Sequence, residues 1–258
     1  LECIRQNVNL SVDFKVYPAK TEGMRPKNHR WKNSVYWKTF LPNTLYFIQR
    51  LRASGQFSEG IWPTPTKHIK NIVKKASYLS YKILKNFTYR DANILVPLFK
   101  TLIRPILEYG NTIWANGIKK YKNLVENVQR KFTKYIKGLT NVPYEERLKS
   151  IKLPSLEFRL IRGDMIQVFK IANKYYDPIT TNSIFNFSDN SRLRGHNFKI
   201  IKQITNKTKF SNFFTNRVVN TWNKLPSNIV NANSINEFKN LFDKHYHEAQ
   251  YKINLDIY

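Results

Sequence analysis

The segment TLIRPILEYGNTIWA, from Thr101 to Ala115, decides the fold, because it is apolar and lies between two strongly basic amphipathic segments. Apolar side chains recur every three or four residues, from just before this segment to its middle. They are Ile94, Leu95, Leu98, Leu102, Ile106 and Tyr109. That spacing is typical of one face of an α-helix. We therefore expect a helix at the centre of the fold, with the two basic segments packed against it.

Two prolines interrupt this central helix. Pro97 and Pro105 each lack a backbone N–H, so we expect either a helix with two kinks or a series of shorter pieces. Thr88 is expected to cap its start, with Asp91 in the first turn, where a carboxylate suits the positive end of the helix dipole. Gly110 is expected to end it.

The first basic segment begins at Lys67. Its apolar residues share one helical face: Ile69, Ile72, Val73, Ala76, Leu79, Ile83, Leu84 and Phe87. The opposite face collects Lys67, Lys70, Lys74, Lys82 and Lys85, with Tyr78 and Tyr81 among them. Such a face can follow phosphates while it offers rings on which sugars or bases can lie. The alternative is a solvated lysine face whose tyrosines pack on a neighbouring helix.

The second basic segment, from about Lys119 to Lys137, repeats this design. Its apolar side contains Leu124, Val125, Val128, Phe132, Tyr135 and Ile136. Across from them lie Lys119, Arg130, Lys134 and Lys137, and Gly138 is expected to end the helix. Because the connections are short, the three helices can bury their apolar stripes together as an antiparallel bundle over residues 67–137. The expected fold class is therefore mainly α.

Residues 138–258 are expected to form a helical C-terminal extension. Its helices are predicted to begin at Pro143, Pro154, Phe210 and Ser234, and the last one reaches about His247. Ser234 and Glu237 form a capping box for this last helix. Residues 180–208 are rich in Asn, Ser and Thr and are expected to be loop, with room for a short strand pair around 196–204.

The charge of the chain points to a polyanionic partner. The formal net charge is +27, from 44 Lys and Arg against 17 Asp and Glu, and residues 67–137 alone hold 16 basic and 3 acidic side chains. Such an excess of positive charge most often binds a nucleic acid and less often an anionic membrane surface. No apolar run approaches the roughly 18 residues of a membrane span, so no membrane is expected among the partners. The single cysteine, Cys3, excludes an internal disulfide and a cysteine-based zinc cluster.

An ordered series of segments carries a family resemblance. The segments LFKTLIRPILEYGNTIW, NLVENVQRKFTKYIKGL and PYEERLKSIKLPSLEFRLIRGDMIQVFKI follow one another. Together they resemble the region just after the polymerase palm in jockey-like reverse transcriptases, the RNA-directed DNA polymerases of non-LTR (LINE-type) retrotransposons. The later RGHNFKI and FFTNRVVNTWNKLP segments resemble the C-terminal end of the same proteins. The resemblance covers roughly His68 to His245, and the start at Leu1 rather than methionine favours a fragment of such a mobile-element protein or a processed product.

The resemblance implies a division of labour between this chain and the rest of the enzyme. Residues 67–137 would be a thumb that clamps the RNA/DNA primer–template, and residues 1–66 a poorly defined N-terminal arm or a palm remnant. The palm would transfer nucleotides with paired aspartates and Mg²⁺. Because no adjacent Asp-Asp pair occurs here, we assign no catalytic residue, expect no cofactor or metal in this chain, and expect it to be inactive alone. The expected location is the nucleus or cytoplasm, and the remainder of the reverse transcriptase polypeptide is a second expected partner.

The predicted nucleic-acid contacts are the exposed cations and rings of the two basic segments. They are Lys70, Lys74, Tyr78, Tyr81, Lys82, Lys85, Lys119, Arg130, Lys134 and Lys137. Arg192 and Arg194 could also grip a phosphate, although a solvated basic loop explains them equally well.

Other chemistry is poorly supported by the sequence. Asp164 and Arg162 fit a structural ion pair or a cap better than a catalytic pair, and His245 and His247 lack a third metal ligand nearby. The rival to an enzyme fragment is a non-enzymatic nucleic-acid-binding or scaffold protein derived from a mobile element. A genomic reading frame that continues upstream into a palm with paired aspartates would favour the enzyme fragment, and a start codon reached first would favour the rival.

Overall fold

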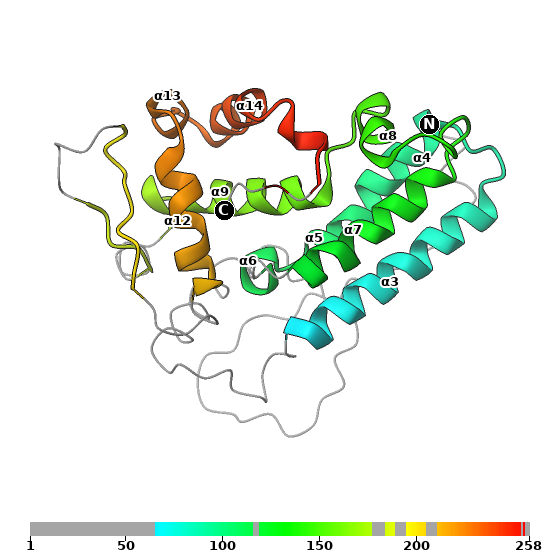
Figure 1. The fold of residues 1–258 in the computed structure, drawn as a ribbon, viewed down its shortest axis with the longest axis horizontal. Coiled ribbons are helices and arrows are strands. Elements are labelled where there is room, and N and C mark those ends of the chain that lie inside the picture. The colour runs from blue at the N-terminus through cyan, green and yellow to red at the C-terminus, as the bar shows by residue number, and fades with distance from the viewer. Residues whose placement is uncertain are drawn as a thin grey trace, which may run out of the picture. The chain divides into compact units, whose positions relative to one another are not determined.

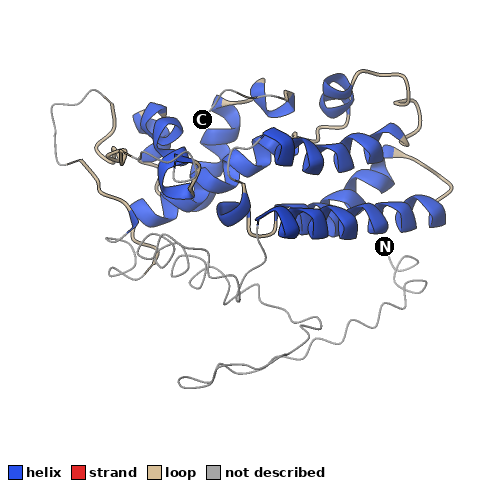
Figure 2. Ribbon diagram, turned by 60° about the horizontal axis from the view of Figure 1, so that its bottom comes forward, coloured by secondary structure: helices blue, strands red, loops and turns tan. Residues whose placement is uncertain are grey.

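The computed structural model describes residues 65–115, 119–176, 184–188, 195–204, 211–253 and 255. Within these ranges the chain is mainly α-helical, as the sequence predicts, and no strand is formed (Figure 2). Of the predicted N-terminal arm over residues 1–66, only the last two positions are described, and Arg192 and Arg194 also lie outside the described residues.

The predicted strand pair around residues 196–204 is wrong. An isolated antiparallel bridge joins Phe187 to Ile200. On its other side, the Ile200 N–H donates to Asn223 Oδ1 at 2.9 Å, and Asn223 Nδ2 donates to the Ile200 carbonyl at 2.9 Å. A side-chain amide therefore occupies the outer backbone groups of Ile200, and its pairing with Phe187 is a single bridge.

Two long amphipathic helices, α3 (Pro65–Asn86) and α7 (Lys119–Lys134), pack against each other (Figure 1). On α3 the predicted apolar face is confirmed, because Ile69, Ile72, Ala76 and Ile83 are buried and the other predicted members are half-buried. On α7, Val125, Val128 and Phe132 are buried as predicted. Tyr135 was wrongly placed on the apolar side. It lies beyond the end of α7, in the turn before Gly138, and it is 51% exposed.

The central apolar segment forms a series of pieces, one of the two arrangements that its prolines predict. These pieces are α4 (Ala92–Leu98), a π-helical turn η1 (Phe99–Ile103) and α5 (Arg104–Glu108). In η1 the Arg104 N–H bonds to the Phe99 carbonyl, five residues back. This wider turn comes directly before Pro105, whose ring would clash with the carbonyl four residues back in a regular α-helix.

The ends of this segment differ from the prediction at one point. Asp91 caps α4 by accepting the Asn93 N–H at 2.6 Å, so the expected cap at Thr88 is wrong. An aspartate directly before the first turn places its carboxylate within reach of the free N–H groups, which a residue three positions earlier cannot do. Gly110, with φ +68°, follows α5 and starts the short helix α6 (Asn111–Trp114).

Two hydrophobic clusters share the helix α9 (Leu156–Ala172). The first is built by α3 to α7, together with the short helix α8 (Tyr144–Ser150) and the first turns of α9 at Leu156 and Leu160. The second uses Phe158 and the rest of α9. Figure 1 shows α9 running between these two groups of helices.

The C-terminal helices cover the second cluster. They are α12 (Phe214–Lys224), α13 (Ser227–Val230) and α14 (Ile235–His245). The 3₁₀ turn η2 (Ala249–Tyr251) follows them, and its Tyr251 packs against the first cluster. Phe169 of α9 stacks on Phe238 of α14 with ring centroids 4.4 Å apart, and Trp222 of α12 is fully buried beside them. The capping box of α14 is formed with one change, because Glu237 Oε2 accepts from the Asn233 N–H rather than from Ser234.

Candidate nucleic-acid interface

The basic face of α3 is open to solvent. Lys70, Lys74, Lys82 and Lys85 are exposed, and the rings of Tyr78 and Tyr81 are 60% and 58% exposed. Most of each tyrosine ring is therefore accessible to solvent. Lys82 Nζ lies 5.4 Å from the centre of the Tyr78 ring, close enough for a cation–π contact.

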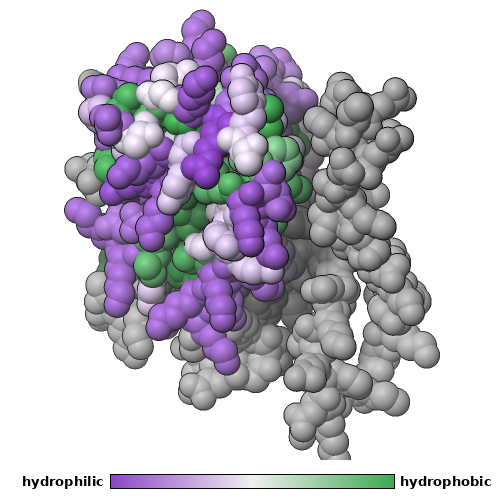
Figure 3. Space-filling model, turned by 90° about the vertical axis from the view of Figure 1, so that its right-hand side faces the viewer, coloured by the Kyte–Doolittle hydropathy of each residue, from purple (hydrophilic) through white to green (hydrophobic). Residues whose placement is uncertain are grey.

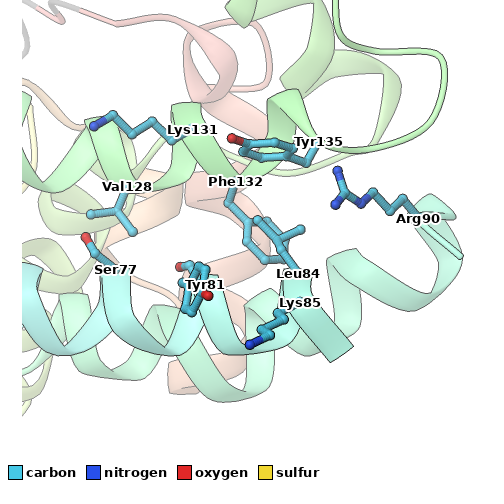
Figure 4. Close-up of a pocket in the computed structure, with 10 residues that line it drawn as sticks. Ser77, Tyr81, Leu84, Lys85, Arg90, Val128, Lys131, Phe132 and Tyr135 are labelled. Carbon is cyan, nitrogen blue, oxygen red and sulfur yellow. The ribbon is translucent and has the colours of Figure 1, made fainter. Parts of the chain in front are cut away.

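A groove of about 390 Å³ lies between the C-terminal halves of α3 and α7 (Figure 4). Its floor is apolar, lined by Leu84 of α3 and by Val128 and Phe132 of α7. The rings of Tyr81 and Tyr135 line it from the two sides. We call this feature the α3–α7 groove.

Three cations line the α3–α7 groove: Lys85 of α3, Lys131 of α7, and Arg90 from the connection between α3 and α4. The guanidinium carbon of Arg90 lies 5.1 Å from the centre of the Tyr135 ring, and the Arg90 carbonyl accepts the Lys137 N–H at 2.8 Å. None of the described residues that line the groove is an aspartate or a glutamate. The groove therefore combines exposed rings, an apolar floor and uncompensated positive charge, which together suit a nucleic-acid strand.

The ten residues predicted to contact nucleic acid lie at several separate places in the structure. Tyr81 and Lys85 line the α3–α7 groove, and Lys70, Lys74, Tyr78 and Lys82 extend the same basic face along α3. On α7, Lys119 and Arg130 line a separate hollow with Asn123, Glu126 and Ile253. Lys134 and Lys137 are exposed near the end of α7. Figure 3 shows hydrophilic side chains over much of the side of the molecule that carries α8, with hydrophobic side chains in the hollows between them.

Three groove residues are not among the contacts predicted from the sequence: Arg90, Lys131 and Tyr135. Arg90 lies in a connection, whose position depends on tertiary packing rather than on local periodicity. Lys131 lies on the edge of α7 that faces α3, and Tyr135 was assigned to the core. Periodicity identifies the buried face of a helix, but it does not say on which side the neighbouring helix packs.

Beneath the interface, a buried carboxylate ties α7 to α8 and α9. Glu126 accepts the Tyr144 hydroxyl at 2.5 Å on one oxygen and the Glu157 N–H at 2.9 Å on the other. Together with Ser155, which accepts the Phe158 N–H, it satisfies donors at the start of α9. Burial raises the pKa of Glu126 above its ordinary value, and the hydrogen bonds from Tyr144 and from the backbone oppose that shift only in part.

Arg162 and Asp164 of α9 form structural ion pairs with partners on other helices. Arg162 donates to both carboxylate oxygens of Asp243 on α14, at 2.5 and 2.7 Å. Asp164 is fully buried and accepts two hydrogen bonds from Arg217 of α12, at 2.9 and 3.1 Å. Arg217 also donates to backbone carbonyls of α6, so these groups hold helices together.

Two histidines, His68 of α3 and His196 of the segment 195–204, are packing residues. His196 is buried against Trp222, and its Nε2 donates to the Trp222 carbonyl at 3.1 Å. His68 packs near Tyr109 and Trp114. Burial is the largest cause that lowers the pKa of each ring. In the part of the chain that the structure describes, no group of three His, Cys, Asp or Glu side chains could hold a metal ion.

Comparison with protein-family models, curated proteins and solved structures gave no match. Among the described residues, no helix is both long enough and apolar enough to cross a membrane.

Proposed function

We propose that this chain is the thumb and post-thumb part of a jockey-like reverse transcriptase, and that it holds the primer–template while a palm outside this chain transfers nucleotides. The ordered series of segments that resembles these proteins supports the family. The α3–α7 groove supports the binding role, because its described lining residues include exposed rings and three cations and no acidic side chain.

The length of the basic face fits a nucleic-acid strand. From Lys70 to Lys85, α3 rises by about 22 Å at 1.5 Å per residue. One strand of a duplex carries a phosphate about every 3.4 Å of helix axis, so this length matches on the order of six phosphates. Lys131 and Arg90 widen the positive surface toward α7. The face therefore has the dimensions of a backbone-tracking surface rather than of a site for one small anion.

The single observation that carries the proposal is the pairing of exposed tyrosines with cations in the α3–α7 groove. A photocrosslinking experiment tests it. A primer–template that carries 5-iodouridine at defined positions is bound to the 258-residue chain, irradiated and mapped by mass spectrometry. We expect crosslinks at Tyr78, Tyr81 and Tyr135. Tyr175, which is also 51% exposed but lies just beyond α9, is the matched control, and an equal yield there would contradict the proposal.

A further inference from the structure

A second hollow, of about 410 Å³, lies between the end of α7 and the start of α8 and collects four cations. We call it the α7–α8 hollow. Arg130, Lys131 and Lys134 line it from α7, and Arg147 lines it from α8, together with the connecting residues around Asn141. Within the described part of the chain, none of its lining residues is acidic. The like charges repel one another, so the hollow has a net attraction for an anion.

Among the described residues, the Nε groups of two arginines of this hollow lack a hydrogen-bond partner. Arg147 is only 5% exposed, and its Nε and that of Arg130 are buried without a hydrogen-bond partner among the described residues. Within the same residues, neither arginine has a carboxylate oxygen within 4.0 Å. A buried charged donor that is left unpaired destabilises the protein, so a binding partner at this place is favoured.

The nearest ring holds both arginines in place. The guanidinium carbons of Arg130 and Arg147 lie 4.9 and 5.4 Å from the centre of the Tyr144 ring. The hydroxyl of Tyr144 is bonded to Glu126, and Glu145 of the same helix accepts the Ile253 N–H. Burial lowers the pKa of Arg147, and the positive charge of Arg130 lowers it further. The arginines are therefore positioned by an aromatic ring, while these two carboxylates are engaged elsewhere.

We propose that the α7–α8 hollow binds a phosphate group of the strand that lies in the α3–α7 groove. An arginine fork matches the oxygens of a phosphate in geometry and charge. Lys131 lines both the hollow and the groove, so a strand can pass from one to the other over this side chain. This inference rests on the proposed nucleic-acid role of the groove and adds a specific anchor point for one phosphate.

Nuclear magnetic resonance of the arginine Nε–H groups tests the inference directly. The full chain is labelled with ¹⁵N at arginine and titrated with a 5′-hydroxyl oligonucleotide, a 5′-phosphorylated oligonucleotide, or inorganic phosphate. Arg130→Lys and Arg147→Lys each remove one signal and so assign it. We expect the Arg130 and Arg147 signals to shift with either oligonucleotide, while the signals of Arg159 and Arg162, which pair with Glu108 and Asp243, stay in place. A larger shift with the 5′-phosphorylated strand would identify a terminal phosphate, and equal shifts an internal one.

The outcomes separate failure of the inference from failure of the proposed function. If the oligonucleotides bind while both signals stay in place, the groove keeps its role and the phosphate site is overturned. If no oligonucleotide binds but inorganic phosphate shifts both signals, the hollow is a site for free phosphate and its assignment to a strand is overturned. As an independent readout, Arg147→Lys should weaken oligonucleotide binding about tenfold, because lysine cannot reproduce the paired hydrogen bonds of a guanidinium fork. Lys149→Gln, an exposed change on the same helix, should weaken it much less, and an equal loss would contradict the site.

Discussion

Arg217 of α12 donates to both carboxylate oxygens of Asp164 on α9, and both side chains are buried where the two helices meet α6. The same guanidinium donates to the carbonyls of Asn111 and Thr112, at 3.3 and 3.2 Å. This contact joins residues 53 positions apart and links the helices of the first hydrophobic cluster to those of the second.

Asp164→Asn should therefore destabilise the fold strongly. It leaves the buried Arg217 charge uncompensated, and breaking a buried pair in this way costs about 3–5 kcal/mol. Asp243→Asn is the matched control, because its pair with Arg162 is partly exposed, and we expect a loss of about 1 kcal/mol or less. Urea unfolding followed by circular dichroism measures both losses. Similar losses in the two variants would show that the Asp164 pair does not hold the clusters together.

Gly163 of α9 allows Asn111 of α6 to approach closely. A Cβ at this position would lie 2.7 Å from Asn111 Nδ2, which donates to the Leu160 carbonyl and to Asp164. In an Asn111→Ala background, Gly163→Ala should stabilise the protein by about 1 kcal/mol, because alanine favours a helix over glycine by that amount. In the natural sequence the same change should give no gain or a loss, since the amide must move. Equal effects in both backgrounds, measured by thermal or urea unfolding, would disprove the close contact.

His196 should make the fold sensitive to mild acid. Burial, and secondarily the charge of Lys199, lowers its pKa below the ordinary value of 6.5, while the bond to the Trp222 carbonyl opposes the shift. The unfolded chain then binds the proton more readily than the folded chain, so stability falls as the pH drops from about 6.5 through the lower folded pKa. His196→Gln should flatten this part of the curve of unfolding free energy against pH. His68, whose pKa is also lowered, remains in that variant, so an unchanged slope would mean that His196 contributes nothing.

Glu126 should make the unfolding free energy depend on pH in the opposite direction, and at a lower pH than His196. Its pKa is raised by burial in the folded state, so the folded chain holds the proton longer and stability falls as the pH rises from about 4.5 through the folded pKa. In Glu126→Gln the side-chain oxygen can still accept the Glu157 N–H, and the amide can donate to Tyr144. The variant should lack the decrease between these pH values. If the unfolding free energy of the wild type rises with pH from about 4.5 upward, and Glu126→Gln shows the same rise, the raised pKa of Glu126 is contradicted.

The sequence predicts most of the helices because their signals are local. The apolar stripe of α3, the start of α8 after Pro143 and the Ser234 cap of α14 all depend on residues within a few positions of one another. The strand pair failed for a different reason. The backbone of Ile200 is satisfied by the side chain of Asn223, more than twenty residues away, and no short-range pattern records such a contact.

The candidate site could be predicted only in part for the same reason. Exposure of the α3 lysines and tyrosines follows from helical periodicity. The groove itself depends on which edge of α7 packs against α3, so the contributions of Lys131, Tyr135 and Arg90 become visible only in three dimensions. Lys119 and Arg130 lie outside the groove for the same reason, because the packing of α7 against α3 decides which α7 residues line it.

The salt dependence of duplex DNA binding tests the central claim most directly. Changing Lys74, Lys85 and Lys131 together to Gln removes three cations from the α3–α7 surface. The slope of log affinity against log salt should then become shallower by about two to three, because each lost phosphate contact contributes roughly 0.9. The matched control changes Lys202, Lys224 and Lys244, three exposed lysines of the C-terminal part, and should leave the slope nearly unchanged. Gln keeps helix propensity, so circular dichroism should be the same in all three proteins. Equal slopes in the two triple variants would show that diffuse positive charge binds the nucleic acid, and would contradict a binding surface on α3 and α7.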